Sequence, residues 1–139
     1  MTKYIIHTDG ASRGNPGEAS IAYVINQDNN LTEFSKRIGN TTNNQAEYQA
    51  LEAALEKLIE LSIEQSQLDF FSDSELMIKQ LTGEYRVKDK GLKVVFRSIQ
   101  DKLATLEKHG STYTLNAIRR QFNKRADELA NYALDNYKS

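Results

Sequence analysis

The first forty residues contain three apolar runs separated by polar segments, the first of which is rich in glycine. The run Lys3 to Asp9 is β-branched and aromatic and is followed by the glycine-rich segment 10–17, so it predicts a strand that ends at Asp9. Ala19–Ile25 and Leu31–Ile38 predict two more strands, joined by a polar turn at residues 27–30. This region therefore predicts an antiparallel meander.

The hydrophobic spacing then changes to that of a helix, which is expected to run from Thr42 to about Leu61. Thr42 and Gln45 have the spacing of a capping box, in which the threonine accepts a hydrogen bond from the main chain three residues on. Apolar residues recur three and four positions apart, which predicts one core-facing side. This stripe consists of Leu51, Ala54, Leu55, Leu58 and Leu61.

Strands and helices alternate in the rest of the chain. Leu68–Ser72 predicts a parallel strand, because it follows a helical crossover, and it ends at Asp73. Thr112–Ile118 predicts a last strand. Helices are expected at Ser74–Leu81, at Leu92–Lys108 and, capped by Asn123, at Lys124–Tyr137. The pattern is that of an α/β fold.

Length and composition limit the class of protein. The 139 residues fit one domain over residues 1–139, and 39% hydrophobic with 27% charged residues is ordinary for a globular protein. The absence of cysteine excludes disulfides, thiolate catalysis and thiolate zinc sites. No apolar run approaches the roughly 18 residues of a membrane span, and the first residues lack the apolar core of a signal peptide. We expect a cytoplasmic protein without membrane association.

The net charge of −1 argues against a protein that holds nucleic acid by bulk positive charge. The charge is nevertheless uneven, because residues 1–70 contain 5 basic and 10 acidic residues, whereas residues 71–139 contain 13 and 9. One side of the molecule is therefore a candidate for anion binding, with solvation of the helices as the simpler alternative.

Glu47 is an acid on the core-facing side of its helix, since it precedes Leu51 by four positions. Removing a lone carboxylate from water costs several kcal/mol unless a cation or a donor meets it. Glu47 is therefore expected either to have a partner or to lie at the rim of a cleft, with favourable interaction with the helix dipole as the alternative.

Three further acids lie at the ends of predicted elements. Asp9 and Asp73 each end a strand, and open α/β sheets bind ligands outside the carboxyl ends of their strands. If the two strands are neighbours, these carboxylates lie roughly 5 Å apart. Asp127 stands in the first turn of the last helix. Turn formation, helix capping and the helix dipole are the respective alternatives.

Four converging acids would repel one another, and such repulsion is tolerated mainly where divalent cations neutralise it. Oxygen-only ligands favour Mg²⁺ or Mn²⁺, and two such ions roughly 3.5 to 4 Å apart are the arrangement of in-line phosphoryl displacement. Phosphodiester hydrolysis is therefore the leading chemistry.

The segments that contain the four acids resemble those of the type 1 ribonucleases H, in the same order. They are Thr8-Asp9-Gly10-Ala11-Ser12-Arg13-Gly14-Asn15-Pro16-Gly17, Thr41-Thr42-Asn43-Asn44-Gln45-Ala46-Glu47, Ser72-Asp73-Ser74-Glu75-Leu76 and Asn123-Lys124-Arg125-Ala126-Asp127-Glu128-Leu129-Ala130. The resemblance implies a five-stranded mixed sheet with its first three strands antiparallel and helices on both faces. It also implies hydrolysis of the RNA strand of RNA–DNA hybrids with two metal ions, leaving 5′-phosphate and 3′-hydroxyl ends.

Carried over by position, the resemblance implies that Asp9, Glu47, Asp73 and Asp127 are the metal-binding catalytic acids. It implies substrate contacts at Gly10, Ala11, Ser12, Arg13, Asn15, Thr42, Asn43, Asn44, Ser74, Tyr85 and Asn123. Contacts to 2′-hydroxyl groups are expected around residues 10–13 and near Glu47, because these groups distinguish RNA from DNA. Thr42 and Asn43 are expected to contact a DNA phosphate, although turn formation and capping also account for them.

Two segments depart from the common bacterial pattern. Residues 117–123 contain no histidine and resemble the archaeal-type variant, in which Arg120 takes that place and holds the scissile phosphate. Arg119 is the alternative if the strand direction exchanges the two. Residues 83–92 link two helices directly and lack a basic protrusion. A smaller basic cluster remains near Tyr85, which is a candidate for stacking on a DNA sugar, and a solvated linker is the alternative. The cluster consists of Arg86, Lys88, Lys90, Lys93 and Arg97.

Two other readings remain. A proofreading-type exonuclease is disfavoured, because Asp9 is followed by Gly10-Ala11 rather than by the expected Asp-x-Glu pattern. A catalytically inactive module that binds hybrid or RNA would be favoured by loss of an acid, but all four are present. We expect a monomer that acts on RNA–DNA hybrid, needs no protein partner and prefers Mg²⁺ or Mn²⁺.

Overall fold

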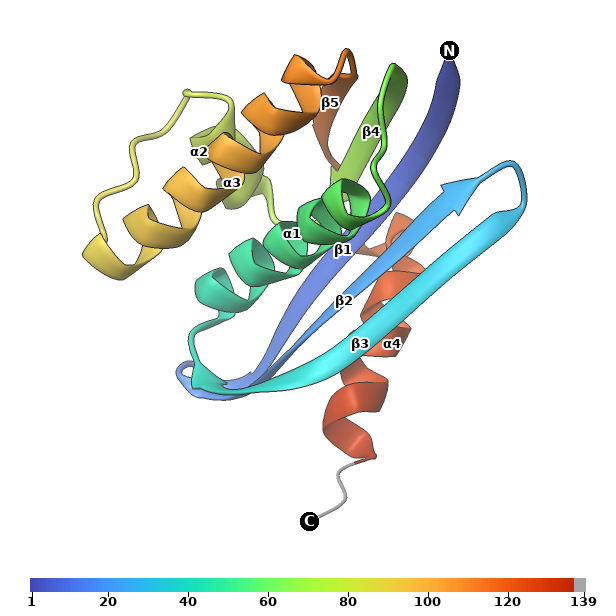
Figure 1. Cartoon of the computed structure of the whole chain (residues 1–139). Coiled ribbons are helices and arrows are strands. Elements are labelled where there is room, and N and C mark those ends of the chain that lie inside the picture. The colour runs from blue at the N-terminus through green and yellow to red at the C-terminus, as the bar shows by residue number, and fades with distance from the viewer. Residues whose placement is uncertain (137–139) are drawn as a thin grey trace.

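The computed structural model describes residues 1–136 and is shown in Figure 1. Its strands are β1 (Thr2–Gly14), β2 (Gly17–Gln27), β3 (Asn30–Thr41), β4 (Ser66–Ser72) and β5 (Thr112–Ala117). Its helices are α1 (Asn43–Glu60), α2 (Glu75–Leu81), α3 (Lys90–Lys108) and α4 (Lys124–Asp135), with a short 3-10 helix at Arg120–Phe122. The predicted order of elements is confirmed. Tyr137, the expected end of the last helix, lies outside the described residues.

The strands form one mixed sheet in the order β3-β2-β1-β4-β5. β1 pairs antiparallel with β2, and β2 with β3, whereas β4 is parallel to both β1 and β5. The β2–β3 turn consists of Asp28 and Asn29, which both have positive φ, as a two-residue hairpin of type I′ requires. The expected sheet is therefore confirmed.

Strand β1 does not end at Asp9, which corrects the prediction. Its pairing with β2 continues from Gly10 opposite Ile21 to Gly14 opposite Gly17, so the glycine-rich segment is strand rather than loop. Its pairing with β4, however, stops at Thr8 opposite Ser72. Asp9 is thus the first residue of β1 without a parallel neighbour, and it faces the gap where β4 ends.

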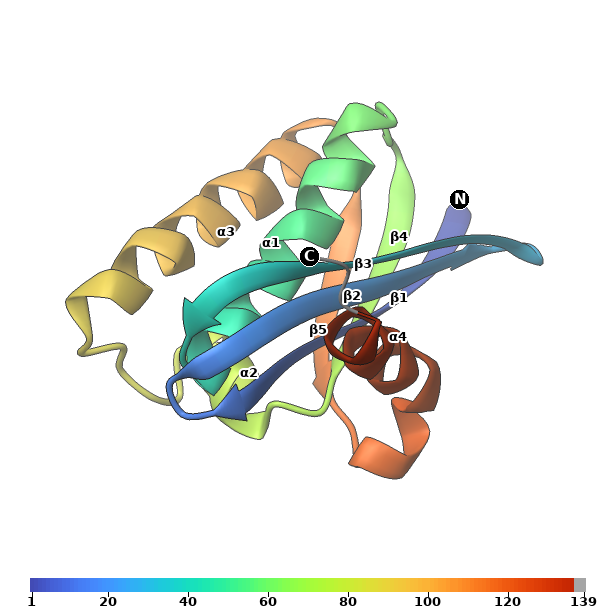
Figure 2. The same ribbon diagram turned by 90° about the horizontal axis from the view of Figure 1, so that it is seen from below.

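Helices cover both faces of the sheet. α1 and α3 pack on one face, and α4 lies on the other against β1, β2 and β3 (Figures 1 and 2). The predicted stripe of α1 is buried except for Leu61, which follows the last helical residue and is 47% exposed. The main core cluster, on the α1 side, includes Ile6, Tyr48, Leu51, Leu55, Leu58, Leu68, Phe70, Ile99 and Leu106.

Side-chain caps set most of the helix starts. Thr42 Oγ1 accepts from the main-chain N–H of Gln45 at 3.1 Å, as predicted. Asp89 accepts from Leu92 N at 2.8 Å, so α3 begins two residues before its predicted start. Asn123 behaves differently from the prediction, because its side chain makes no cap at α4 and instead donates to the carbonyl of Thr8 at 2.9 Å.

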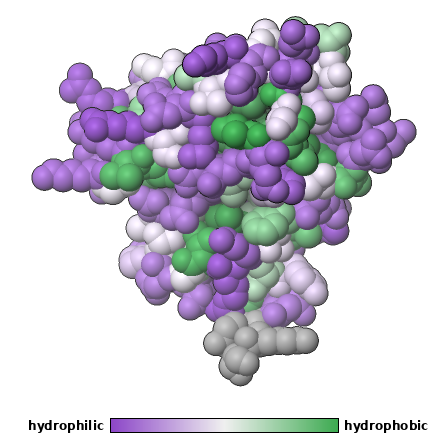
Figure 3. Space-filling model, viewed as in Figure 1, coloured by the Kyte–Doolittle hydropathy of each residue, from purple (hydrophilic) through white to green (hydrophobic). Residues whose placement is uncertain are grey.

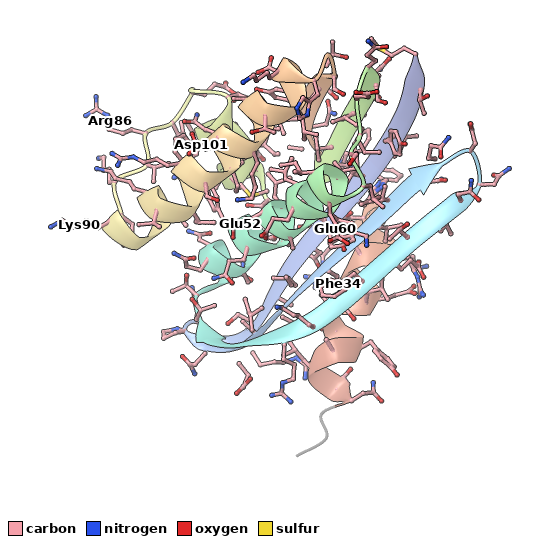
Figure 4. All side chains as sticks on the ribbon, in the orientation of Figure 1. Phe34, Glu52, Glu60, Arg86, Lys90 and Asp101 are labelled. Carbon is pink, nitrogen blue, oxygen red and sulfur yellow. The ribbon has the colours of Figure 1, made fainter. Side chains whose placement is uncertain are left out.

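The surface is mainly polar. On the face drawn in Figure 3, hydrophobic residues form separate patches among hydrophilic ones. One hollow of about 700 Å³ lies between α1 and β3, with Glu52 and Glu60 on the helix and Phe34 on the strand (Figure 4). Within residues 1–136, no helix combines the length and apolar character needed to cross a membrane.

Candidate active site

Three of the predicted acids meet where β1 and β4 part. One carboxylate oxygen from each of Asp9, Glu47 and Asp73 lies within 4.8 Å of the other two. Asp9 comes from β1, Glu47 from the first turns of α1, and Asp73 from the residue after β4. Asp73 is available to the site because the neighbouring Ser74, not Asp73, caps α2 by accepting from Met77 N at 3.3 Å.

Gly10 allows α1 to approach β1 closely enough for this contact. A Cβ atom at Gly10 would lie 2.2 Å from the carbonyl carbon of Ala46 and 2.3 Å from the nitrogen of Glu47, which no real side chain could tolerate. The N–H of Gly10 donates to Glu47 Oε1 at 2.8 Å. The missing side chain thus provides both the space for the helix and a donor for the buried Glu47 carboxylate.

Burial and mutual repulsion hold protons on this cluster. Burial raises the pKa of Asp9 to about 8, helped by the negative charges of Asp73 and Asp127, while Arg120 opposes the shift. The pKa of Glu47 is raised well above its usual range, first by burial and then by the charges of Asp9 and Asp73, although the Gly10 N–H lowers it. Without added positive charge the site cannot keep all of its carboxylates ionised at neutral pH.

Asp127 and Arg120 complete the site from the C-terminal part of the chain. Asp127 stands in the first turn of α4, close enough for its charge to raise the pKa of Asp9. Arg120 Nη2 donates to Asp127 Oδ1 at 3.1 Å. Arg119 instead precedes the 3-10 helix, so of the two candidate arginines it is Arg120 that reaches the acids.

The donor set fits a divalent cation. All of the converging groups are carboxylate oxygens, which are the ligands that Mg²⁺ and Mn²⁺ prefer. The pKa values of Asp9 and Glu47 are raised first by burial and then by the neighbouring negative charges, which a cation would offset. Arg120 and Arg13 both line the cavity, but Arg13 is paired with Asp135, so the four acids outnumber the positive charges beside them. A cation held by Asp9, Glu47 and Asp73 would remove that imbalance.

Most predicted substrate-binding residues surround the acids. A cavity of about 390 Å³ is lined by the acids, by Arg120 and by Gly10, Ala11, Ser12, Arg13, Asn43, Ser74 and Asn131. Asn15, Thr42 and Asn44 do not line this cavity. They line a separate hollow of about 340 Å³ at the N-terminal ends of α1 and α3. Asn15 Oδ1 accepts from the N–H of Asn43 at 3.0 Å, which ties the β1–β2 turn to the start of α1.

Tyr85 is not brought to the acids. It lines another hollow, of about 530 Å³, with Arg86, Lys93, Phe96 and Arg97. Its ring is half exposed and lies under the ammonium group of Lys79, 5.2 Å from the ring centre. Figure 4 shows Arg86 and Lys90 projecting outward from the linker and from the start of α3.

Asn123 is placed differently from the expectation of a substrate contact. It is 1% exposed, and its amide holds the Thr8 carbonyl directly before Asp9. The main-chain N–H of Asp127 in turn donates to the Asn123 carbonyl at 3.1 Å. Asn123 therefore joins the segments that carry two of the acids rather than reaching the cavity.

One cavity residue, Asn131, was not predicted from the sequence. Asn131 lies one helical turn after Asp127 and donates to its carboxylate at 3.2 Å. The spacing of four residues on a helix was the available signal. An asparagine in mid-helix is so common on surfaces, however, that spacing alone does not single it out.

The fold and the site together define an α/β protein with a cluster of carboxylates where two parallel strands end, a donor set that fits a divalent cation. Known proteins agree with this class. The RNase H family model matches residues 1–135. The chain belongs to the RNase H family.

Individual relatives support this assignment. Ribonuclease HI of Halobacterium salinarum is 39% identical over 129 residues, which cover 91% of this chain and 62% of the relative. The crystal structure of RNase H1 from the same organism has a TM-score of 0.87 at 36% identity and covers 97% of this chain and 99% of that one. LC11-RNase H1, solved in complex with RNA/DNA hybrid, has a TM-score of 0.87 at 40% identity, covering 95% and 96%.

Some relatives are longer than this chain. The chain spans about six tenths of the Halobacterium relative, and 36% of a bifunctional protein of Mycobacterium tuberculosis to which it is 32% identical. Ribonuclease H of Clostridium botulinum, by contrast, is matched over 99% of both chains at 32% identity. The similarity to this chain is therefore a property of the RNase H part of the longer proteins.

Proposed function

We propose that this chain is an endonuclease that hydrolyses the RNA strand of RNA–DNA hybrids with divalent metal ions, leaving 5′-phosphate and 3′-hydroxyl ends. The observation that carries the proposal is the trio Asp9, Glu47 and Asp73, whose oxygens lie within 4.8 Å in an open cavity with Asp127 and Arg120 at its side. The 40% identical LC11-RNase H1, solved with an RNA/DNA hybrid, supports the choice of substrate.

The four acids have the role of metal ligands in this proposal. Asp9, Glu47 and Asp73 would hold one cation. Asp127 and Asp9 would hold the other, on the side of the site nearest to α4. The chemistry that bound Mg²⁺ or Mn²⁺ supplies in such sites is positive charge for the attacking and leaving oxygens of an in-line phosphoryl displacement. Mg²⁺ is the proposed ion, with Mn²⁺ as a substitute.

Arg120 binds the scissile phosphate in this proposal. Its guanidinium is 75% exposed at the edge of the cavity, so it can turn from Asp127 to a phosphate without leaving the site. A guanidinium stays protonated at neutral pH and therefore cannot act as a general acid, but it stabilises charge that develops on phosphate oxygens.

The remaining cavity residues select the strand. Main-chain groups of residues 10–12 line the cavity and would contact a ribose 2′-hydroxyl next to the scissile phosphate, while the Ser12 hydroxyl donates to the carbonyls of Gly14 and Thr41 and holds this edge of the cavity. Asn15, Thr42 and Asn44, in the second hollow, would receive a phosphate of the opposite strand. We propose that the RNA strand crosses the acid cavity and that the DNA strand crosses this second hollow.

Cleavage of end-labelled duplexes tests the proposal. RNA–DNA hybrid, DNA duplex and RNA duplex are incubated with the protein, each with Mg²⁺ and with EDTA, and resolved on denaturing gels. We expect internal cuts only in the RNA strand of the hybrid and only with Mg²⁺. Binding of hybrid without cleavage would instead identify an inactive binding module, and shortening from one end would identify an exonuclease.

Asp9→Asn and Asp73→Asn test the assignment of these two acids to the catalytic centre. A tenfold loss of rate corresponds to a barrier increase of about 1.4 kcal/mol, and each variant should lose far more than that. Circular dichroism should show an unchanged fold. If either variant retained a tenth or more of the wild-type rate at saturating Mg²⁺, its assignment to the catalytic centre would be wrong. Size-exclusion chromatography tests the accompanying proposal that the protein acts as a monomer.

A further inference from the structure

Asn131 makes a contact with a candidate metal ligand that the proposed roles leave unexplained. It lies on α4 one turn after Asp127 and lines the acid cavity. Its Nδ2 donates both to the Asp127 carbonyl at 2.9 Å and to Asp127 Oδ1 at 3.2 Å. One amide group therefore holds the main chain and the carboxylate of the same acid.

The other end of the amide is also held. Arg13 Nη2 donates to Asn131 Oδ1 at 3.3 Å and to Asp135 Oδ1 at 2.7 Å. A guanidinium only donates and a carboxylate only accepts, so these partners allow one orientation of the amide, with its oxygen toward Arg13 and its nitrogen toward Asp127. The end of β1 thus fixes the direction in which Asn131 presents its donor.

Asp127 Oδ1 has two donors, but only one of them is free to leave. Arg120 comes from the exposed 3-10 helix and, in the proposed function, turns to the scissile phosphate. Asn131 stays with Asp127, because both belong to the same helix and Arg13 holds its far end. When Arg120 moves away, the Asn131 contact remains to orient the carboxylate.

We propose that Asn131 is a positioning residue, which holds the Asp127 carboxylate in the orientation that binds a divalent cation while Arg120 engages the substrate. This inference rests on the proposed function. Groups that hydrogen-bond to metal ligands typically alter metal affinity or activity by about 10- to 100-fold when they are removed. A side chain that only stabilised the helix would alter neither.

The residue that caps the end of this helix provides a matched control. Asn136 Nδ2 donates to the carbonyl of Tyr132 at 3.0 Å, which is the contact that Asn131 makes with the Asp127 carbonyl, four residues back. This contact of Asn136 is to a carbonyl and not to a carboxylate. Comparing Asn131→Ala with Asn136→Ala therefore separates the effect on the Asp127 carboxylate from the effect on the helix.

The first measurement uses no nucleic acid. Mg²⁺ alone is titrated into the metal-free wild type, Asn131→Ala and Asn136→Ala by calorimetry. We expect a dissociation constant about tenfold higher for Asn131→Ala and unchanged for Asn136→Ala. Asn131→Gln, which keeps an amide, should recover part of the loss, and thermal unfolding of each variant verifies that it is folded.

The second measurement is turnover of RNA–DNA hybrid. We expect kcat to fall about tenfold in Asn131→Ala at a fixed Mg²⁺ concentration below saturation, to recover in part as Mg²⁺ is raised, and KM for hybrid to stay the same. Equal Mg²⁺ affinity and equal kcat in the two alanine variants would overturn the inference. If the wild type cleaved no hybrid, the proposed function would fail, and the Mg²⁺ titration would still decide the role of Asn131.

Discussion

Asp9 carries its proton into the neutral pH range because its carboxyl group is buried beside two other acids. Its pKa of about 8 lies far above the usual value of 3.8, and burial is the largest cause. A group whose pKa rises on folding stabilises the folded state fully below its unfolded pKa, and that contribution is lost as pH rises toward the folded pKa. The metal-free protein should therefore become less stable between about pH 4 and pH 8 on account of this residue.

Asp9→Asn should remove this pH dependence, because the amide resembles the protonated carboxyl and does not ionise. In urea titrations with EDTA, we expect the unfolding free energy of the wild type to fall relative to that of the variant by about 1 kcal/mol or more from pH 5 to pH 8. Millimolar Mg²⁺ at pH 7 should stabilise the wild type more than the variant. Parallel pH curves for the two proteins would show that Asp9 does not titrate in this range.

Arg120 and Arg119 are neighbours with different surroundings, which makes them a matched pair. Arg120→Ala should reduce kcat on RNA–DNA hybrid by about 100-fold, the usual effect of removing a donor to developing negative charge. Arg119→Ala should change kcat less than twofold. Steady-state kinetics at saturating Mg²⁺ measure both effects. Small and equal decreases in kcat would show that both arginines are surface charges without a role in catalysis.

At the scale of elements, the path of β1 shows what sequence patterns could and could not predict. The β-branched run located the strand, and the order of strands and helices followed from the change in hydrophobic spacing. The glycine-rich segment predicted a stop at Asp9, whereas the strand continues because β2 pairs with it as far as Gly14. Pairing with a distant partner is a tertiary effect that local composition does not report.

The candidate site was predictable to a similar degree. Glu47 is the clearest case, because an acid on the buried side of a helix needs a donor or a cation. In the structure it accepts from the Gly10 N–H and lies with Asp9 and Asp73 in a group that could hold a metal ion. Asn123 is the opposite case. It has the residue type and position of a helix cap, but its side chain bonds to Thr8, 115 residues earlier in the sequence. No local pattern encodes that contact.

The crossing of α1 over β1 depends on Gly10, which gives a prediction for Gly10→Ala. Its Cβ would lie 2.2 Å from main-chain atoms of α1, which cannot move as a flexible side chain does. We expect a loss of about 2 kcal/mol or more in unfolding free energy, the upper part of the range for overpacking, together with lower activity because Glu47 is displaced. Urea denaturation and hybrid cleavage measure the two effects.

Gly91→Ala is the control for that substitution. Gly91 lies in the first turn of α3, and a Cβ there would lie 3.4 Å from Asp89 Oδ2 and 3.5 Å from Gln45 Nε2, which is ordinary contact. Because alanine favours helices over glycine by up to about 1 kcal/mol, Gly91→Ala should leave stability unchanged or raise it slightly. Equal effects of the two variants would contradict the close-approach argument.

For the whole molecule, the separation of charge matters more than the net charge of −1. Of the basic residues around Tyr85, Arg86, Lys93 and Arg97 line a hollow that contains none of the four acids. A duplex that reached from the acid cavity to this hollow would lose counterions there, and its affinity would become salt-dependent. The basic cluster would then contribute a salt-dependent part of the affinity for the duplex, and the acid cavity would bind the strand that is cleaved.

Arg97→Gln and Lys93→Gln test this arrangement. If each side chain contacts a phosphate, each substitution should weaken hybrid binding and reduce the slope of log K against log salt by about 1. Lys57→Gln, in the hollow between α1 and β3 where Lys57 contacts Glu60 at 3.5 Å, should change neither. Binding measured by fluorescence anisotropy with EDTA separates affinity from cleavage. An unchanged slope in all three variants would identify the cluster as a solvated linker.

The contacts between β1 and α4 also have a consequence for the growing polypeptide. Thr8 and Arg13 are bonded to Asn123 and Asp135, which follow them by 115 and 122 residues. During synthesis, while residues after 122 are still inside the ribosome, Asp9, Glu47 and Asp73 have already emerged, but Asp127 has not. These contacts cannot form until both partners have left the ribosome. Nascent chains at this stage should therefore leave nearby RNA–DNA hybrids intact, and cleavage should begin only when the last helix packs beneath the first strand.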